Sequence, residues 1–179
     1  LRMKILLVAP PWMDIYGNYR EAAKLGCVSP PLGLAYLGGA ILESGGECRI
    51  VDMEAESVSP EDLLEIIRAE NPRIVGITAT TPVFENARRI AAMIKDRFPD
   101  LTVGIGGAHS TVVRRAVLEQ SPMFDFQVCG EGERAIQEIS AALEQGRSLA
   151  GVANVIYREN GEIIENPSRP LVENLDELP

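Results

Sequence analysis

Four breaks between apolar segments carry the residues of this chain that could take part in chemistry. Most of these residues are small or bear a hydroxyl group, and almost none form acid–base pairs. Hydroxyls can hydrogen-bond the polar atoms of a ligand, and glycine lets a ligand approach the backbone closely. The breaks therefore favour binding of a large cofactor over catalysis by the chain alone. The residues concerned are Pro10, Pro11 and Trp12 in the first break, Thr78, Thr80 and Thr81 in the second, Gly106, Gly107 and His109 in the third, and Cys129, Gly130 and Glu131 in the fourth.

His109 is the one histidine of the sequence. It could coordinate a metal, transfer protons or cap a helix. No second histidine, cysteine or suitably spaced carboxylate accompanies it, so the sequence predicts no metal site built from protein ligands alone. It also lacks an identifiable nucleophile to activate. An ordinary turn histidine remains an alternative to a histidine that contacts a ligand.

The other breaks also have structural alternatives. Gly106 and Gly107 could pass close to a phosphate at the start of a helix, or could simply form a tight turn. Thr78, Thr80 and Thr81 could bind a ligand or cap the following helix. Each motif alone leaves both interpretations open, and they gain weight only from standing together in one chain.

The elements that must position these breaks alternate between short apolar runs and amphipathic stretches. This order predicts a parallel sheet whose strand-to-helix turns meet at one edge, where ligands bind in such folds. The predicted helix at residue 60 has the strongest start signal, with Ser59 and Asp62 in capping-box spacing around Pro60. The expected strands are residues 3–9, 47–51, 74–77, 101–105 and 124–128. The first expected helix starts at residue 31 and is ended by Gly45 and Gly46, and the others cover about residues 60–70, 83–97, 108–120 and 131–144.

Two segments depart from this alternation. Residues 10–29 have no clear period and predict a long loop, which in compact domains is usually functional or mobile. Residues 152–157 and 162–165, joined by Asn160 and Gly161, predict a β-hairpin. The chain after the hairpin has the composition of a linker, so we expect a domain over residues 1–148 and a hairpin with a linker over residues 149–179.

Composition excludes several classes of partner. The net charge of −9, from 17 basic and 26 acidic residues, argues against nucleic acid and anionic membranes. No segment reaches the roughly 20 apolar residues that cross a bilayer. The three cysteines are far apart and have neither disulfide-framework nor zinc-site spacing, which favours a reducing, cytoplasmic setting.

Three common nucleotide- or phosphate-binding folds fit the sequence poorly. A dinucleotide-binding fold would place G-x-G-x-x-G after the first strand, where the chain has Ala9-Pro10-Pro11-Trp12. A Walker loop is absent as well. A phospho-acceptor receiver domain would need an aspartate at the end of the third strand, where Thr78 stands.

Five motifs in one order resemble the N-terminal cobalamin (vitamin B12)-binding domain of B12-dependent radical S-adenosylmethionine (SAM) enzymes. The resemblance covers essentially the whole chain. It extends to the closing Leu175-Asp176-Glu177-Leu178-Pro179, which looks like the approach to a radical SAM barrel. The motifs are Ala9-Pro10-Pro11, Pro30-Pro31-Leu32-Gly33-Leu34-Ala35-Tyr36-Leu37, Val75-Gly76-Ile77-Thr78, Gly106-Gly107-Ala108-His109 and the run from Asp125 to Glu133.

The resemblance implies a fold and a site. The fold is an α/β, flavodoxin-like or Rossmann-like three-layer arrangement with a five-stranded parallel sheet of order 2-1-3-4-5 and a C-terminal hairpin. Cobalamin would place its nucleotide tail between the turns and rest its corrin ring on top. The residues implied to contact it are Pro10, Pro11, Trp12, Thr78, Thr80, Thr81, Gly106, Gly107, His109, Cys129, Gly130 and Glu131.

Two departures from related patterns matter. Some B12 domains carry D-x-H-x-x-G after the first strand, and its histidine binds cobalt from below. Here Asp14 is followed by Ile15, Tyr16 and Gly17, so the cofactor would be bound without that histidine, in a His-off state. We expect residues 11–29, with Trp12, Tyr16, Tyr19 and Arg20, to cover the lower face. The C-x-x-x-C-x-x-C motif of an iron–sulfur cluster is also missing, so the chain should bind but not catalyse.

The leading hypothesis is a cobalamin-binding domain of a larger radical SAM enzyme, a methyltransferase or a relative. SAM and the 4Fe–4S cluster would then belong to a C-terminal radical SAM domain outside this chain, which would be its partner. The rival hypothesis is a B12-type fold without cofactor that serves as a docking or structural module. A third is a flavin- or nucleotide-binding flavodoxin-like protein.

Overall fold

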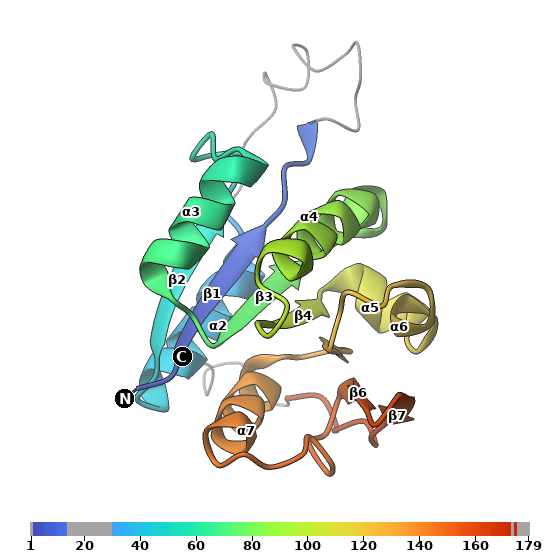
Figure 1. Cartoon of the computed structure of the whole chain (residues 1–179). Coiled ribbons are helices and arrows are strands. Elements are labelled where there is room, and N and C mark those ends of the chain that lie inside the picture. Colours follow the sequence, from blue (N-terminus) through green and yellow to red (C-terminus); the bar gives the residue numbers. More distant parts are fainter. Residues whose placement is uncertain (1, 14–29, 173, 175–179) are drawn as a thin grey trace.

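A computed structural model of the chain describes residues 2–13, 30–172 and 174. These residues form an α/β fold around one sheet (Figure 1). The sheet has seven strands in the order β2-β1-β3-β4-β5-β6-β7. The strands are β1 (Lys4–Ala9), β2 (Glu47–Asp52), β3 (Ile74–Thr78), β4 (Thr102–Gly106), β5 (Phe126–Val128), β6 (Val155–Glu159) and β7 (Glu162–Glu165).

The sheet is mixed, and this corrects the expected five-stranded parallel sheet. Strands β1 to β5 are parallel, but β6 pairs antiparallel with β5 and β7 pairs antiparallel with β6. Asn160 and Gly161 both have positive φ, at 51° and 84°, as a tight hairpin turn requires. The predicted hairpin therefore forms, but it continues the sheet beyond β5. The domain boundary at residue 148 stays a prediction.

Helices connect the parallel strands, and their starts follow local signals. Ser59 accepts a hydrogen bond from the Asp62 N–H, and the Asp62 side chain accepts one from the Ser59 N–H, so the predicted capping box is confirmed. Asn71 ends that helix in the left-handed conformation. The helices are α2 (Leu32–Glu43), α3 (Pro60–Glu70), the 3-10 turn η2 (Thr81–Val83), α4 (Phe84–Arg97), α5 (Ala108–Val113), α6 (Ala116–Gln120) and α7 (Glu133–Glu144).

The helix expected over residues 108–120 is divided into α5 and α6. Arg114 separates them, with a φ of 54°, a value that non-glycine residues rarely adopt. Its guanidinium binds Glu165 in β7, with Nε 3.1 Å from the carboxylate oxygen. The next residue, Arg115, donates to the Ile163 carbonyl at 2.7 Å. Contacts with β7, about fifty residues away in sequence, thus accompany a break that local periodicity could not reveal.

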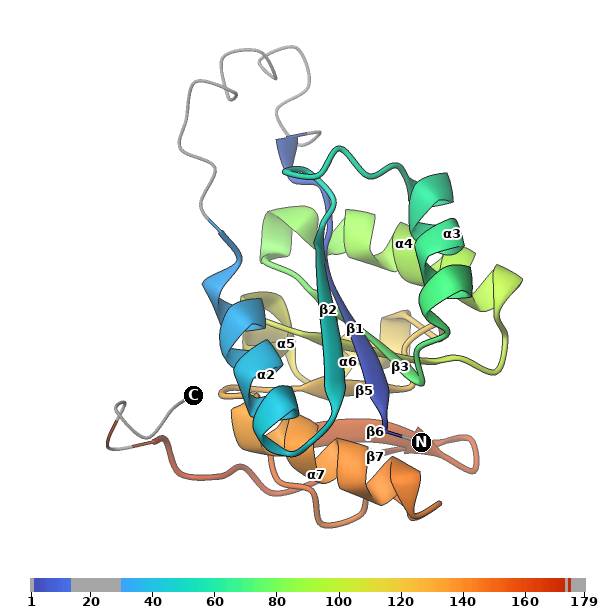
Figure 2. The ribbon, with the colours of Figure 1, turned by 90° about the vertical axis from the view of Figure 1, so that its left-hand side faces the viewer.

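Two hydrophobic cores lie on opposite faces of the sheet. Leu63 of α3, Ile90 of α4 and Leu118 of α6 belong to one core. Ile41 of α2 and Ile139 of α7 belong to the other. Figure 2 shows α2 and α3 on opposite sides of β1 and β2. The three-layer arrangement predicted from the sequence is therefore present, with α2 and α7 together on one face.

Candidate functional site

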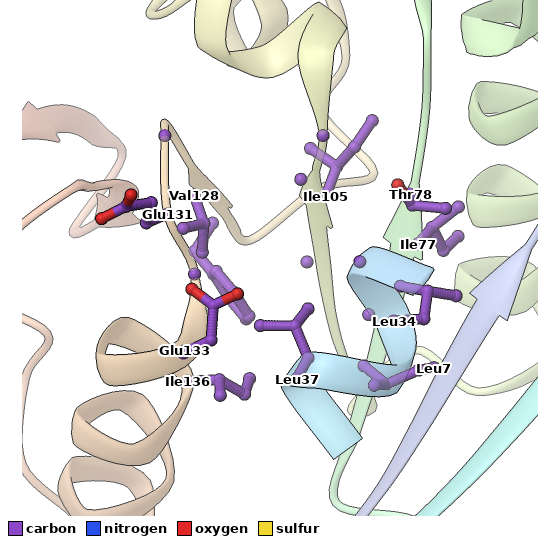
Figure 3. A pocket seen from close by; sticks show the side chains of 18 residues that line it. Leu7, Leu34, Leu37, Ile77, Thr78, Ile105, Val128, Glu131, Glu133 and Ile136 are labelled. Atoms are coloured by element: carbon purple, nitrogen blue, oxygen red, sulfur yellow. The ribbon is translucent and has the colours of Figure 1, made fainter. Parts of the chain in front are cut away.

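A groove lies between α2 and α7, over the carboxyl-terminal halves of β3 and β4 (Figure 3). Its volume is about 180 Å³. Most of the side chains that line it are apolar. The lining residues are Leu7, Gly33, Leu34, Leu37, Gly76, Ile77, Thr78, Gly104, Ile105, Gly106, Gly107, Phe126, Val128, Gly130, Glu131, Gly132, Glu133 and Ile136.

Glycines form the floor of the groove. Gly76 and Gly104 are register partners on β3 and β4, and Gly106 pairs with Thr78 two residues further along. Alternate strand residues face the same side, so Gly104 and Gly106 leave two successive positions of β4 without a side chain. A Cβ atom on Gly104 would come within 2.2 Å of the Phe126 ring, and one on Gly76 within 3.0 Å of Leu7 Cδ2. The floor is open only because these side chains are missing.

Aliphatic side chains from two helices form the walls. Leu34 and Leu37 come from α2 and Ile136 comes from α7, as Figure 3 shows. Gly132 lies where α7 begins, and a Cβ there would approach Leu37 Cδ2 to 2.9 Å. The missing side chain lets the two helices approach closely, so the groove is narrow and apolar.

Polar groups stand at the rim. The Thr78 hydroxyl lies at the end of β3, Glu131 lies between β5 and α7, and Glu133 is the first residue of α7. Glu131 is held from two sides: its carboxylate accepts the Val172 N–H at 2.8 Å, and its carbonyl accepts from Asn154 Nδ2 at 3.1 Å. The rim therefore offers one hydroxyl and two carboxylates to the polar part of a ligand.

The size and lining of the groove define what it can hold. Pockets for whole drug-sized ligands measure roughly 300–1,000 Å³. A groove of about 180 Å³ accommodates one end of a larger ligand. Its aliphatic walls and glycine floor fit a flat apolar group, because backbone atoms can contact both ring atoms and edges where no side chain intervenes.

Five of the predicted site residues come together at this groove: Thr78, Gly106, Gly107, Gly130 and Glu131. Gly130 has a φ of +85°, and its N–H donates to Thr111 Oγ1 at 2.9 Å. Gly107 has a φ of +97°, and a Cβ there would lie 2.8 Å from the Ala79 carbonyl oxygen. Gly107 is thus required by the backbone itself, whereas a Cβ on Gly106 meets nothing closer than the Val128 carbonyl oxygen at 3.9 Å.

Thr80, Thr81 and His109 lie outside the lining of the groove. His109 stacks on the Phe84 ring with a centroid distance of 3.9 Å, and its Nδ1 lies 3.1 Å from Thr81 Oγ1. Its side chain is buried, and burial lowers the pKa of the imidazole below its ordinary value. Phe84 packs against the core on the α3 and α4 face. The arrangement is that of a neutral histidine packed at a helix start.

Cys129 is buried beside the groove but does not line it. Its Sγ donates to the Ser110 carbonyl at 3.3 Å and accepts from Gln127 Nε2 at 3.2 Å. Burial raises the pKa of the thiol above its ordinary value, so the group is a poor thiolate nucleophile at neutral pH. Its position indicates a packing role on the α5 side of β5.

Pro10, Pro11 and Trp12 extend the end of β1, away from the groove lining. The Pro11 carbonyl accepts from Asn86 Nδ2 at 2.8 Å, and the Trp12 N–H donates to Glu54 Oε2 at 3.2 Å. These contacts fix the chain as it leaves the sheet. The predicted cover over residues 11–29 lies, from Asp14 onward, outside the described residues.

The sequence reasoning missed the walls of the groove and, except for Gly106, its floor. Gly76, Gly104, Leu34, Leu37 and Ile136 were assigned only to strands and helices. The available signal was glycine at alternate positions of neighbouring strands, in Ile-Val-Gly-Ile-Thr and Thr-Val-Gly-Ile-Gly. Glycine is unfavourable inside strands, so two such strands indicate a position where another group approaches the backbone.

Two negative findings apply to the described part of the chain. No cluster of three or more histidine, cysteine, aspartate or glutamate residues there could hold a metal ion. None of its helices is long and apolar enough to cross a membrane.

Comparisons with known proteins identify a family and relatives of the chain. Residues 22–140 match the family model described as the B12 binding domain. The chain is 38% identical over 177 residues to an uncharacterized methyltransferase from Pyrococcus horikoshii, covering 99% of this chain and 37% of that protein. It is 30% identical to an anaerobic magnesium-protoporphyrin IX monomethyl ester cyclase from Synechocystis, covering 97% of this chain and 34% of that protein. The chain thus spans about a third of the length of these curated relatives.

A solved structure matches the fold. The cobalamin-dependent SAM radical enzyme OxsB, with aqua-cobalamin and SAM bound, superposes with a TM-score of 0.78 at 16% sequence identity. The match covers 95% of this chain and 23% of that chain. At this identity the likeness concerns the α/β fold.

Proposed function

The chain belongs to the B12-binding domain family, and from this premise we propose that the groove between α2 and α7 receives the nucleotide tail of cobalamin. The observation that carries the proposal is the glycine floor formed by Gly76, Gly104 and Gly106. The groove accepts one flat apolar end of a larger ligand, and dimethylbenzimidazole at the end of cobalamin is such a group. The much wider corrin ring would remain outside, at the carboxyl edge of the sheet.

Particular residues would hold the cofactor. Leu34, Leu37 and Ile136 would contact the two faces of the tail, and the Thr78 hydroxyl would hydrogen-bond its polar atoms. Gly106 would let the tail lie against the backbone of β4. The predicted contacts of Thr80, Thr81, His109, Cys129, Pro10, Pro11 and Trp12 would at most be indirect, because these residues do not line the groove.

We further propose His-off binding of cobalamin. His109 is the one histidine of the sequence, and it is enclosed by Phe84 and Thr81. The first break, which supplies the cobalt-binding histidine in other B12 domains, has none. A bound cobalamin would supply a cobalt centre able to carry a methyl group. The part of this chain would be to hold and orient it.

The wider role follows from what the chain lacks. Its cysteines, Cys27, Cys48 and Cys129, cannot provide C-x-x-x-C-x-x-C for a 4Fe–4S cluster. Named relatives include a methyltransferase and a cyclase about three times as long as this chain. We propose that the chain is the cofactor module of a cytoplasmic radical SAM enzyme, a methyltransferase or a relative. Residues after the hairpin would lead to the domain that binds SAM and the cluster.

A binding experiment tests the site. The purified 179-residue chain is mixed with hydroxocobalamin, free ligand is removed, and the visible spectrum is recorded. We expect the wild-type chain to retain cobalamin and Gly106→Leu to lose it, because the leucine would enter the groove without displacing backbone. Ala92→Leu, which adds the same bulk on the exposed side of α4, is the matched control and should retain the cofactor.

Three results would contradict the proposal. A wild-type chain that retains no cobalamin would favour the rival function, a cofactor-free docking module. Retention by Gly106→Leu equal to wild type would place the tail somewhere other than the groove. A flavin spectrum in the protein as purified would favour the flavodoxin-like alternative.

A further inference from the structure

The outward side of α2 differs from that of the other surface helices. The exposed side chains of Leu32, Ala35, Tyr36 and Leu42, which we name the α2 stripe, carry no charge, and the one charged residue of α2 is the exposed Glu43 at its last position. Leu32 is 62% exposed, Tyr36 44% and Leu42 61%. Ala35, Tyr36 and Leu42 follow Leu32 by three, four and ten residues, and these helical spacings place the four side chains along one side of α2.

The other long helices show what a solvated face looks like in this protein. The exposed residues of α3 include Glu61, Asp62 and Glu65, and those of α4 include Glu85 and Arg89. These faces carry ion pairs between Glu65 and Arg68 and between Glu85 and Arg88. A helix that is apolar on all sides is normally buried on all sides. The α2 stripe lacks the charged and ion-paired side chains that the exposed faces of α3 and α4 carry.

The described residues after the hairpin run along α7 to the rim of the groove. Arg169 binds Glu138 of α7 at 2.6 Å, and its N–H donates to Asn154 Oδ1 at 2.7 Å. Val172 donates to Glu131 at the rim of the groove. The residues after the hairpin are thus fixed along α7 and end at the same rim to which Gly33 and Leu37 of α2 contribute. Beside them Leu171 is 75% exposed.

We propose that the α2 stripe is the docking face for the domain that forms the rest of the longer protein. This inference rests on the proposed function for the identity of that domain, a radical SAM domain. Three observations favour this occupant: the side chains of the stripe carry no charge, the described residues after the hairpin reach the adjacent rim at Val172, and the curated relatives have roughly twice as much chain again. Docking there would hold the second domain beside the mouth of the groove.

Hydroxyl-radical footprinting tests the proposal. It compares the oxidation rates of Leu32, Tyr36 and Leu42 in the isolated chain and in the longer protein that contains it. We expect ready oxidation in the isolated chain and at least about tenfold protection in the longer protein. Phe98, at the opposite edge of the sheet, is the internal control and should react equally in both.

A pair of variants adds an energetic readout. Leu32→Ser with Tyr36→Ser removes apolar contact area at exposed positions, and Glu61→Ser with Glu65→Ser is the matched change on α3. The remaining domain is supplied as a separate chain, and its dissociation constant for each variant is measured. We expect the α2 variant to bind at least about tenfold more weakly and the α3 variant to bind as wild type does.

Each contrary outcome has a definite meaning. Low reactivity of the stripe in the isolated chain would show that this chain already covers it, and would overturn the proposal. A dimer of the isolated chain that the α2 variant dissolves would assign the stripe to a second copy instead. The proposal would also be overturned if the stripe reacted equally in the isolated chain and in the longer protein and if the α2 variant bound the remaining domain as tightly as wild type.

Cobalamin retention is read separately on the isolated chain. Retention with an unprotected stripe would overturn only this inference. A protected stripe without retention would overturn only the proposed cofactor.

Discussion

The same two strands present opposite designs on the two faces of the sheet. Toward α3 and α4, β3 and β4 carry Val75, Ile77, Val103 and Ile105, which fill a core with β-branched side chains. Toward α2 and α7 the intervening positions include Gly76, Gly104 and Gly106. One face is packed for stability, while the other lacks side chains in the region where a ligand would lie. The cavity therefore exists because glycines leave positions in the middle of the sheet without a side chain. The packed core on the opposite face supports the strands at these positions.

The largest expected effect comes from filling the glycine floor. In Gly104→Val the new side chain would collide with the Phe126 ring, so we expect loss of cobalamin retention and about 1–3 kcal/mol less free energy of unfolding. Val103→Ala is the matched control on the other face of β4, and its two lost methyl groups cost about 2 kcal/mol. Urea unfolding and spectra of retained cobalamin measure both. The asymmetry of the faces would be refuted if both variants lost the cofactor.

The second effect concerns the turn that leads out of β4. Gly107→Ala places a Cβ against the Ala79 carbonyl at a φ of +97°, so we expect about 1–3 kcal/mol lower free energy of unfolding. Gly33→Ala is the contrasting change, because a Cβ there meets nothing within 4 Å and α2 should gain about 0.5–1 kcal/mol. Urea melts separate the two. Equal effects would mean that the backbone of this turn tolerates alanine.

The third effect concerns His109, which stacks on Phe84 at the packed face of the sheet covered by α3 and α4. Burial lowers the pKa of the folded imidazole, so the unfolded chain binds the proton more readily, near pH 6.5. Stability from this group should be complete above that pH and should fall as the pH drops from about 7 toward 5.5. His109→Gln should remove this dependence, whereas Thr81→Val should keep it because the imidazole remains buried. A wild-type free energy of unfolding that does not change over this pH range would contradict the assignment.

The smallest effect lies at the amino-terminal edge of the sheet, far from the groove. Arg49 at 2.6 Å and Lys4 at 3.2 Å hold the pKa of Glu70 below its usual value. The contribution of this carboxylate to stability is present above its unfolded pKa, near 4.3, and is lost as the pH falls through the lower folded pKa. Glu70→Gln should be slightly less stable than wild type at pH 7, should approach it at about pH 3, and should retain cobalamin unchanged. An effect on retention would show that the two edges are coupled.

Local signals predicted much of the fold. Ser59, Pro60 and Asp62 determine a helix start through contacts within four residues, and the strands follow from short apolar runs. The hairpin was also evident from Asn160 and Gly161. Its continuation of the sheet was not, because pairing of β6 with β5 depends on contacts between segments distant in sequence. The same reason explains the missed break at Arg114, whose guanidinium binds Glu165.

The residues predicted at the candidate site lie at its rim and at one position of its floor, Gly106, whereas Gly76 and Gly104 of the floor were missed. Thr78, Gly106 and Glu131 follow strands, so the rule that turns of a parallel sheet share one edge was enough to place them together. Gly76 and Gly104 matter only because they are neighbours across two strands and Phe126 lies beside them. That relation depends on strand register and on the inward direction of each residue, which no single strand reveals.

The glycine floor also has a consequence for chain entropy. Glycine inside a strand gives up more backbone freedom on folding than alanine does, at about 0.5–1 kcal/mol for each residue, and contributes no side-chain contact in return. The middle of β3 and β4 is thus the costliest part of the sheet to order. Whatever fills the groove binds only the folded chain and must stabilise it in proportion to its concentration and affinity. The fraction of folded domain in the cell should therefore rise with the concentration of available cofactor.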